Sequence, residues 1–287
     1  MPEGLDAPEQ GLTLHQAADA LGVHYMTAYR YVRTGRLPAS RLGGTWRVDA
    51  ADLDLLRRPA HGETRRETGL PMSRGQLQSR LIAGDEVGAW SILESALGSG
   101  TSSEGILLDL LAPVLVSIGR GWESGELSVA DEHRATSVTL RLIGRLGARF
   151  ARRGRKRGTV VLAAPPGEQH GVPVAIAADL LRWRGFEVVE LGADTPADTL
   201  AATVARNPDL IAVGIACTTR GALRTVRKTI AGIHREAPGI PVILGGAAIH
   251  DAEQARALGA DLFTGGRADA VISAVEALVN AEATPAP

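Results

Sequence analysis

The chain has 287 residues, of which 45% are hydrophobic and 22% charged, and its formal net charge is −1. This length is enough for two or three compact domains, and the near-zero net charge excludes a general polyelectrolyte. The single cysteine, Cys217, excludes an internal disulfide framework and fits a reducing cytoplasm. No apolar run approaches membrane-spanning length, and residues 1–10 lack the basic-then-apolar form of a signal peptide. We therefore expect a cytoplasmic protein that makes no use of a membrane.

Residues 11–58 predict a small helical domain with a strand hairpin. Thr13 and Gln16 have the spacing of a capping box, and the apolar residues that follow form one helical face. The elements expected in chain order are a first helix after Thr13, a turn at 22–23, a second helix over about 24–34, a hairpin or wing within 39–48, and a closing helix over 50–56.

Positive charge is concentrated in one part of this domain. From His24 to Arg47 there are five arginines and no acid, and all three tyrosines of the chain lie within seven residues. The segments LTLHQAADALGV (12–23) and TAYRYVRTGRLP (27–38) resemble excisionase-type and MerR-type winged helix-turn-helix domains. This resemblance implies that the second helix enters the DNA major groove while the wing contacts phosphates. The alternative is a protein-interaction module with a solvated basic face. The candidate DNA-contacting residues are Tyr25, Thr27, Tyr29, Arg30, Arg33, Arg41 and Arg47.

A linker over 59–72 and a helical region over 73–153 follow. The linker holds prolines and glycines without apolar periodicity. Four apolar helical segments predict a four-helix bundle, with a kink or restart around Pro113 and a last helix capped by Ser128 with Asp131.

Residues 158–282 predict a doubly wound, flavodoxin-like α/β domain. Apolar strands alternate with helical segments, as a parallel sheet with crossover helices requires. The strands are expected at 159–164, 187–191, 210–216, 241–244 and 261–264, and the helices at 174–184, 196–207, 220–235, 252–258 and 268–281. No Gly-x-Gly-x-x-Gly follows the first strand, so this domain is not expected to bind NAD.

The loop at 166–172 follows the first strand, where open α/β sheets bind ligands. It carries Glu168-x-His170, in which the carboxylate can orient the imidazole and raise its basicity. Alone, one histidine in a loop is equally an ordinary solvated side chain. Together with Ala216-Cys217-Thr218 and Gly245-Gly246, in the same order and at similar spacing, it resembles the signature of cobalamin-binding domains. The resemblance implies a Rossmann-like cobalamin domain with His170 as the lower ligand of cobalt, and glycines that admit the nucleotide tail of the cofactor.

The helical region contributes a second motif, Trp122-x9-Glu132-His133. By itself this pattern favours a core tryptophan followed by ordinary first-turn residues, with the acid stabilised by the helix dipole. Beside a cobalamin domain it resembles the cap of adenosylcobalamin-dependent photoreceptor repressors of the CarH type. The resemblance implies that Trp122 and Glu132 line the upper face of the corrin and enclose the adenosyl group. The full set of candidate cofactor-binding residues is Trp122, Glu132, His133, Glu168, His170, Gly171, Ala216, Thr218, Gly245, Gly246 and Gly265.

Three positions depart from the family pattern. Pro173 replaces a glycine, which is tolerable if the proline opens a helix, and Ala216 replaces a serine that contacts the cofactor tail. Glu123 stands where the photoreceptors have a histidine after the tryptophan, so a light response can end in a different cobalt state or be absent.

The sequence as a whole predicts a non-enzymatic regulator that binds operator or promoter DNA and cobalamin, for which the resemblance implies the adenosyl form. The resemblance implies a light-responsive repressor that acts as a homo-oligomer, a dimer or tetramer, without a membrane. The alternatives are a corrinoid carrier of a methyltransferase system, a light-independent cobalamin sensor, and a DNA-binding protein whose cobalamin site has decayed.

Overall fold

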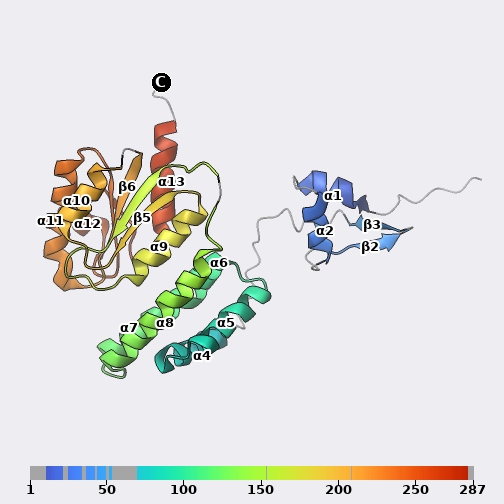
Figure 1. Cartoon of the computed structure of the whole chain (residues 1–287), viewed down its shortest axis with the longest axis horizontal. Coiled ribbons are helices and arrows are strands. Elements are labelled where there is room, and N and C mark those ends of the chain that lie inside the picture. The colour runs from blue at the N-terminus through green and yellow to red at the C-terminus, as the bar shows by residue number, and fades with distance from the viewer. Residues whose placement is uncertain are drawn as a thin grey trace, which may run out of the picture. The chain divides into compact units, whose positions relative to one another are not determined.

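The computed structural model describes residues 11–21, 25–33, 37–42, 44–49, 52–53, 70–152, 154–207 and 209–283. The chain divides into two units, Met1–Glu67 and Thr68–Pro287. The first is a small helical head, and the second combines a helical region with a sheet domain (Figure 1).

The head contains the two expected helices and the expected hairpin. Its elements are β1 (Leu12–Thr13), α1 (Leu14–Leu21), α2 (Tyr25–Arg33), β2 (Ser40–Leu42) and β3 (Thr45–Val48). The predicted capping box is confirmed, because the Gln16 amide donates to the Thr13 hydroxyl and the Thr13 amide donates to the Gln16 side chain. The strands form an antiparallel sheet in the order β1-β3-β2.

Some expectations for the head differ from the structure or lie outside it. The two-residue strand β1 was not predicted, because such a short strand leaves no alternation in the sequence. The predicted turn at 22–23 lies outside the described residues. Of the predicted closing helix at 50–56, only residues 52 and 53 are described, and both are helical.

The helical region begins at Leu70, inside the predicted linker. The helix tolerates Pro71 because this residue lies in the first turn, where backbone N–H groups have no partner within the helix. Its helices are α4 (Leu70–Ala83), α5 (Glu86–Gly98), the continuous run α6 (Ser103–Gly105), η1 (Ile106–Leu111) and α7 (Ala112–Glu123), and α8 (Val129–Gly147). Their shared apolar core includes Leu77, Leu81, Leu93, Leu107, Leu111, Val138 and Leu142. The capping box of Ser128 and Asp131 at the start of α8 is confirmed.

The helix does not break at Pro113 but accommodates it through the π-helical segment η1. A proline cannot donate to the carbonyl four residues earlier, which here belongs to Asp109. The side chain of Arg74 donates to this carbonyl instead, with an Nε–O distance of 2.7 Å. The wider π turn and the Arg74 bond therefore let one helix continue from Ser103 to Glu123.

This continuous helix corrects the expectation that no apolar segment approaches membrane-spanning length. Ser103–Glu123 has 21 residues and a mean hydropathy of 1.4, enough to span a membrane by length and composition alone. Core helices of folded domains meet the same criterion, and Ile106, Leu110 and Val114 of this helix are buried in the helical region.

The sheet domain has the predicted strands, within one or two residues, in a parallel sheet. They are β4 (Thr159–Ala163), β5 (Glu187–Gly192), β6 (Leu210–Ala216), β7 (Val242–Gly245) and β8 (Leu262–Phe263). The predicted helices are also confirmed as α9 (Val172–Trp183), α10 (Ala197–Ala205), α11 (Leu223–Glu236), α12 (Ala252–Ala257) and α13 (Ala270–Ala283). The strand order is β5-β4-β6-β7-β8, and every pairing is parallel.

This order is that of a doubly wound, flavodoxin-like sheet. The chain leaves β4 for β5 on one side and later returns to β6 on the other, so the carboxyl end of β4 is the topological switch point. Figure 1 shows α10, α11 and α12 on one face of the sheet and α9 and α13 on the other. The α9 face shares one core with the helical region, in which Phe150 packs edge-on against Trp183.

Candidate functional site

The loop after β4 holds a buried carboxylate and a half-exposed imidazole in direct contact. Glu168 Oε1 lies 2.5 Å from His170 Nδ1, and the side chains are 0% and 38% exposed. The same oxygen also accepts from the backbone amide of His170 at 3.1 Å. This pair therefore fixes both the position of the loop and the orientation of the ring.

Glu168 also joins this loop to the one after β6. Its second oxygen, Oε2, accepts from the amides of Thr218 and Thr219 at 2.6 and 2.7 Å, and from the Thr219 hydroxyl at 3.1 Å. Burial opposes ionisation of Glu168, but the hydrogen bonds from His170 and from the amides of Thr219 and Thr218 outweigh it and lower the pKa of the carboxyl to about 2. The carboxylate is thus ionised at neutral pH.

An ionised Glu168 determines which nitrogen of His170 is free. Because Nδ1 points to the carboxylate, it carries the proton in the neutral ring and leaves the lone pair on Nε2. The hydrogen bond to Glu168 raises the pKa of His170, burial opposes this shift, and the charges of Glu168 and Glu132 add to it. The loop therefore presents an oriented, electron-rich imidazole, which is the arrangement of a metal-binding histidine.

Beside this pair, the loops after β6 and β7 approach so closely that side chains are excluded. A Cβ at Gly246, where φ is +111°, would overlap the backbone of Cys217, and a Cβ at Gly245 would overlap the Thr264 hydroxyl. The Thr218 hydroxyl is buried without a hydrogen-bond partner in the described part of the chain. The two glycines therefore let these loops pack against each other, and the unsatisfied hydroxyl is a polar group that a ligand could satisfy.

The helical region contributes Trp122, Glu132 and His133. Trp122 lies at the end of α7 and is 43% exposed, so the alternative that it fills the core is wrong. Glu132, in the first turn of α8, lies 2.6 Å from His133 Nδ1 and accepts from the Thr136 hydroxyl at 2.8 Å. The negative charge of Glu132 also contributes to the raised pKa of His170.

The remaining predicted cofactor residues are backbone positions around the same loops. Gly171 precedes α9, and Pro173 lies in the first turn of that helix, as expected for a proline that opens it. Ala216 ends β6 beside Gly245, and the Gly265 carbonyl accepts from the Gly246 amide at 2.8 Å.

Two residues that sequence reasoning did not select organise the site. Thr219 donates twice to Glu168. Asp194 accepts from the Gly167 amide at 2.8 Å, and its own amide donates to the Glu168 carbonyl. Asp194 is also the one non-glycine residue of the described chain with a positive φ, +50°. No pattern in the sequence indicates the contact of Asp194 with Gly167, 27 residues earlier, because the contact depends on how two loops meet.

These features fit cobalamin. An imidazole with a free Nε2 could hold cobalt, and the unsatisfied Thr218 hydroxyl could donate to the cofactor. The exposed ring of Trp122 is a flat apolar surface, and the carboxylate of Glu132 is a hydrogen-bond acceptor. The replacement of the family serine by Ala216 removes one hydroxyl, while the Thr218 hydroxyl remains available.

The structure describes some of the candidate DNA-contacting residues of the head. Arg41 is exposed on β2, with its guanidinium 5.4 Å from the Trp46 ring centroid, and Arg47 donates to the Gly11 carbonyl. Tyr25 and Tyr29 were expected to face outward, but both are half-buried because their rings pack against the head core. The side chains of Thr27, Arg30 and Arg33 lie outside the described residues.

Comparison with known protein families assigns a domain to each of these parts. Residues 158–276 match the model of the B12 binding domain, and residues 74–146 match a second B12 binding domain model. Residues 12–58 match a helix-turn-helix domain model. The chain therefore has two regions of the B12-binding type behind a helix-turn-helix head.

Individual relatives include both regulators and corrinoid proteins. The HTH-type transcriptional repressor CarH of Myxococcus xanthus is 38% identical over 143 residues, which are 49% of this chain and 46% of that protein. The methanol–corrinoid protein of Methanosarcina barkeri (strain Fusaro / DSM 804) is 24% identical over 139 residues, which are 48% of this chain and 54% of that protein. The chain thus spans about half the length of the curated relatives it matches.

A solved structure shares the fold of the second unit. The Methanosarcina barkeri monomethylamine corrinoid protein has a TM-score of 0.61, covers 72% of this chain and 99% of its own, and is 17% identical. Together with the domain matches, the similarity to CarH confirms the resemblance that the motifs indicated: the chain combines a helix-turn-helix domain with B12 binding domains.

Proposed function

We propose that this chain, a CarH-type regulator by its domains, is a cytoplasmic transcriptional repressor that binds adenosylcobalamin and responds to light. The observation that carries the proposal is the ionised Glu168 that holds His170 with Nε2 free. A helix-turn-helix head on the same chain connects that site to DNA.

In this proposal the residues of the site divide into a lower and an upper set. His170 would hold cobalt through Nε2, while Glu168 keeps the proton on Nδ1. Gly245, Gly246 and Thr218 would hold the cofactor tail. The bound group supplies a cobalt–carbon bond that light can cleave. In the four-helix cap, Trp122 would exclude water from the bound cofactor, and Glu132 would accept hydrogen bonds from the ribose hydroxyls.

We infer that the winged helix-turn-helix head, spanning 11–58, binds operator DNA through α2 and the β2–β3 wing. Several heads in one dimer or tetramer raise the effective concentration of each, so a change in assembly changes DNA occupancy strongly. Arg41 is the described residue best placed for a phosphate contact, because it is an exposed cation on the wing.

The test is to add adenosylcobalamin to the apoprotein in darkness and to record the absorption spectrum and particle mass before and after green light. A bound-cobalamin spectrum and a larger particle that shrinks on illumination support the proposal. Binding without a change in mass under light supports a light-independent sensor instead. Absence of binding refutes the cofactor assignment and leaves the helix-turn-helix head.

A second candidate function is a corrinoid carrier in methyl transfer. The observation that favours it is the shared fold of the monomethylamine corrinoid protein over nearly the whole of that protein. The head and the exposed Trp122 favour the regulator, because a methyl group needs no enclosing cap. Equal affinity for methylcobalamin and adenosylcobalamin, with no effect of Trp122→Ala on either, would favour the carrier.

A further inference from the structure

The outer surface of α11 carries a stripe of cations that the cofactor site does not use. A helix residue advances by about 100° and rises by about 1.5 Å. Arg224, Arg227, Lys228 and Arg235 therefore share an arc of about 100° over a length of about 16 Å. All four are exposed, and the exposed Arg220 precedes them on the same side. We call these five residues the α11 stripe.

The stripe is not neutralised by its surroundings. Arg224, Arg227 and Lys228 make no ion pair or side-chain hydrogen bond with any described residue. Two members of the stripe have partners among the described residues: Arg235 lies 3.8 Å from Glu236 at the end of the helix, and Arg220 Nη2 lies 3.3 Å from His250 Nε2. In a chain with a net charge of −1, such an unpaired run of like charges on one helix face is available to attract an anionic partner.

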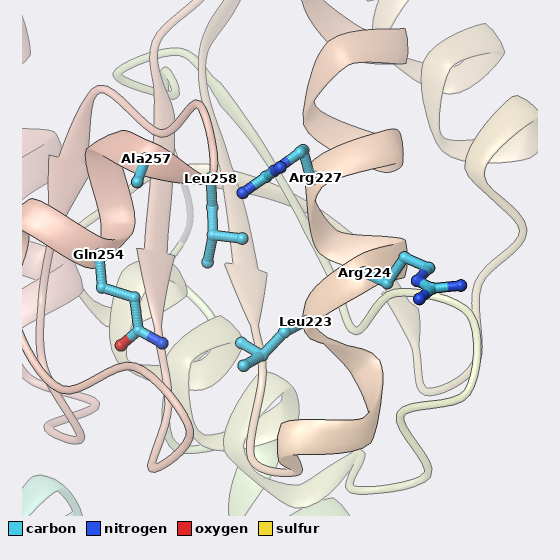
Figure 2. A pocket seen from close by; sticks show the side chains of 6 residues that line it. All are labelled: Leu223, Arg224, Arg227, Gln254, Ala257 and Leu258. Carbon is cyan, nitrogen blue, oxygen red and sulfur yellow. The ribbon is translucent and has the colours of Figure 1, made fainter.

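A surface pocket of about 370 Å³ lies against the stripe, between α11 and α12. Arg227 extends over it towards Leu258, whereas Arg224 extends away along the outer surface (Figure 2). Gln254 accepts from the His250 amide through its oxygen, which leaves its NH2 group free to donate. The pocket thus offers donors at its rim and an apolar floor formed by Leu223, Ala257 and Leu258.

These features point to a polyanion with apolar parts, rather than to a small anion. The stripe extends well beyond one pocket, and over about 16 Å a B-form strand offers about five phosphates. Arginine and glutamine side chains commonly contact phosphates, and an apolar floor suits deoxyribose. The centres of protein–protein interfaces are depleted in charge, whereas protein–DNA interfaces are strongly positive.

We propose that the α11 stripe is a second, sequence-independent contact surface for duplex DNA, on the sheet domain and separate from the head. It adds to the proposed function but does not depend on cofactor binding or on light. Its contribution is affinity through release of counterions from phosphates, not recognition of bases.

The test compares two full-length variants with the same change in net charge. The stripe variant is Arg224→Gln/Arg227→Gln/Lys228→Gln, and the control is Arg149→Gln/Arg152→Gln/Arg155→Gln, which removes three exposed cations elsewhere. Binding of a 30-base-pair duplex of arbitrary sequence is measured by fluorescence anisotropy over a range of salt concentrations, after thermal denaturation has shown that both variants are folded.

The slope of log affinity against log salt should become shallower by about 2 to 3 in the stripe variant, since each phosphate contact contributes about 0.9. Its affinity should fall at least tenfold at low salt, while the control keeps the slope of the unmodified chain. Equal slopes in all three proteins, or the same loss in both variants, would overturn the proposal. Unchanged duplex binding with lost binding of poly-glutamate would assign the stripe to an acidic protein instead, and also overturn it.

The outcome can be separated from that of the proposed function. Failure of adenosylcobalamin to bind, with the slope difference intact, would refute the proposed function and support the stripe. Cofactor-dependent operator binding with equal slopes would support the proposed function and refute the stripe.

Discussion

Replacement of Glu168 by glutamine should damage both the stability of the sheet domain and its affinity for cobalamin. The two oxygens of Glu168 face donors only: His170 N–H and Nδ1 on one side, and the amides of Thr218 and Thr219 with the Thr219 hydroxyl on the other. A glutamine of the same shape has one oxygen and one NH2 group. In either orientation, the NH2 group must therefore face a backbone N–H.

The less costly orientation leaves the oxygen towards Thr218 and Thr219 and turns the NH2 group to His170. Nδ1 can then accept only if the ring proton moves to Nε2, the nitrogen that has to ligate cobalt. Removing one partner from a buried ionic network typically costs about 3–5 kcal/mol. Loss of such an outer hydrogen bond to a metal-binding histidine typically lowers metal affinity about 10- to 100-fold.

We therefore expect Glu168→Gln to lower the free energy of unfolding of the apoprotein by about 3–5 kcal/mol in urea titrations. The matched control is Glu132→Gln, which alters another glutamate bonded to a neighbouring histidine, at a partly exposed site on the cap. Its effect on apoprotein stability should be at most about 1 kcal/mol. A Glu168→Gln protein as stable as the unmodified chain, with full cobalamin affinity, would refute the reasoning.

Three further substitutions or reagents test other parts of the structure. Gly246→Ala should lower the free energy of unfolding by more than about 2 kcal/mol, because the added Cβ would overlap the Cys217 backbone. Gly167 also has a positive φ but open space around it, so Gly167→Ala should cost only about 1–2 kcal/mol for the strained backbone. Thermal denaturation of both variants checks the difference. Burial, together with the charge of Glu168, raises the pKa of the Cys217 thiol to about 11. A thiol reagent at pH 8 should therefore react only after the chain unfolds, and rapid reaction of the folded chain would contradict this. Burial also raises the pKa of Asp179, so this group binds its proton more tightly in the folded state and opposes folding above its folded pKa. Asp179→Asn should therefore be at least as stable as the unmodified chain at pH 7, and the difference in unfolding free energy should shrink as the pH falls through the folded pKa of Asp179. A variant that unfolds at lower urea concentration than the unmodified chain at pH 7 would contradict this.

Most of the fold could be predicted from local sequence patterns. The strands of the sheet domain are short, strongly apolar runs, and the helices between them are amphipathic, so each element is indicated by its own residues. The expectations that differed depend on contacts between distant residues. The helix through Pro113 continues because Arg74, 39 positions earlier, donates to the Asp109 carbonyl, to which the proline has no N–H to donate. No local sequence rule predicts that bond.

The orientation of Tyr25 and Tyr29 was misjudged for a related reason. A helical wheel separates two faces, but a head as small as this one buries the flanks of α2 as well as its centre. The ring of Tyr25 stacks on His15 of α1, with the centroids 4.2 Å apart. A tyrosine can satisfy both demands, since its ring packs while its hydroxyl remains near the surface.

The cofactor site shows the same limit more sharply. Motifs could nominate Glu168 and His170, but the chemistry of the pair depends on Thr218 and Thr219, fifty positions further on. These amides lie within hydrogen-bond distance of Glu168 because β6 pairs with β4 at the switch point of the sheet, so the loops that follow these two strands lie side by side. Without them, a buried carboxylate would be driven towards its neutral form, the His170 proton would no longer be held on Nδ1, and the free electron pair would not be confined to Nε2. The state of one imidazole nitrogen is therefore a consequence of strand order, which is why a correct motif is not yet a site.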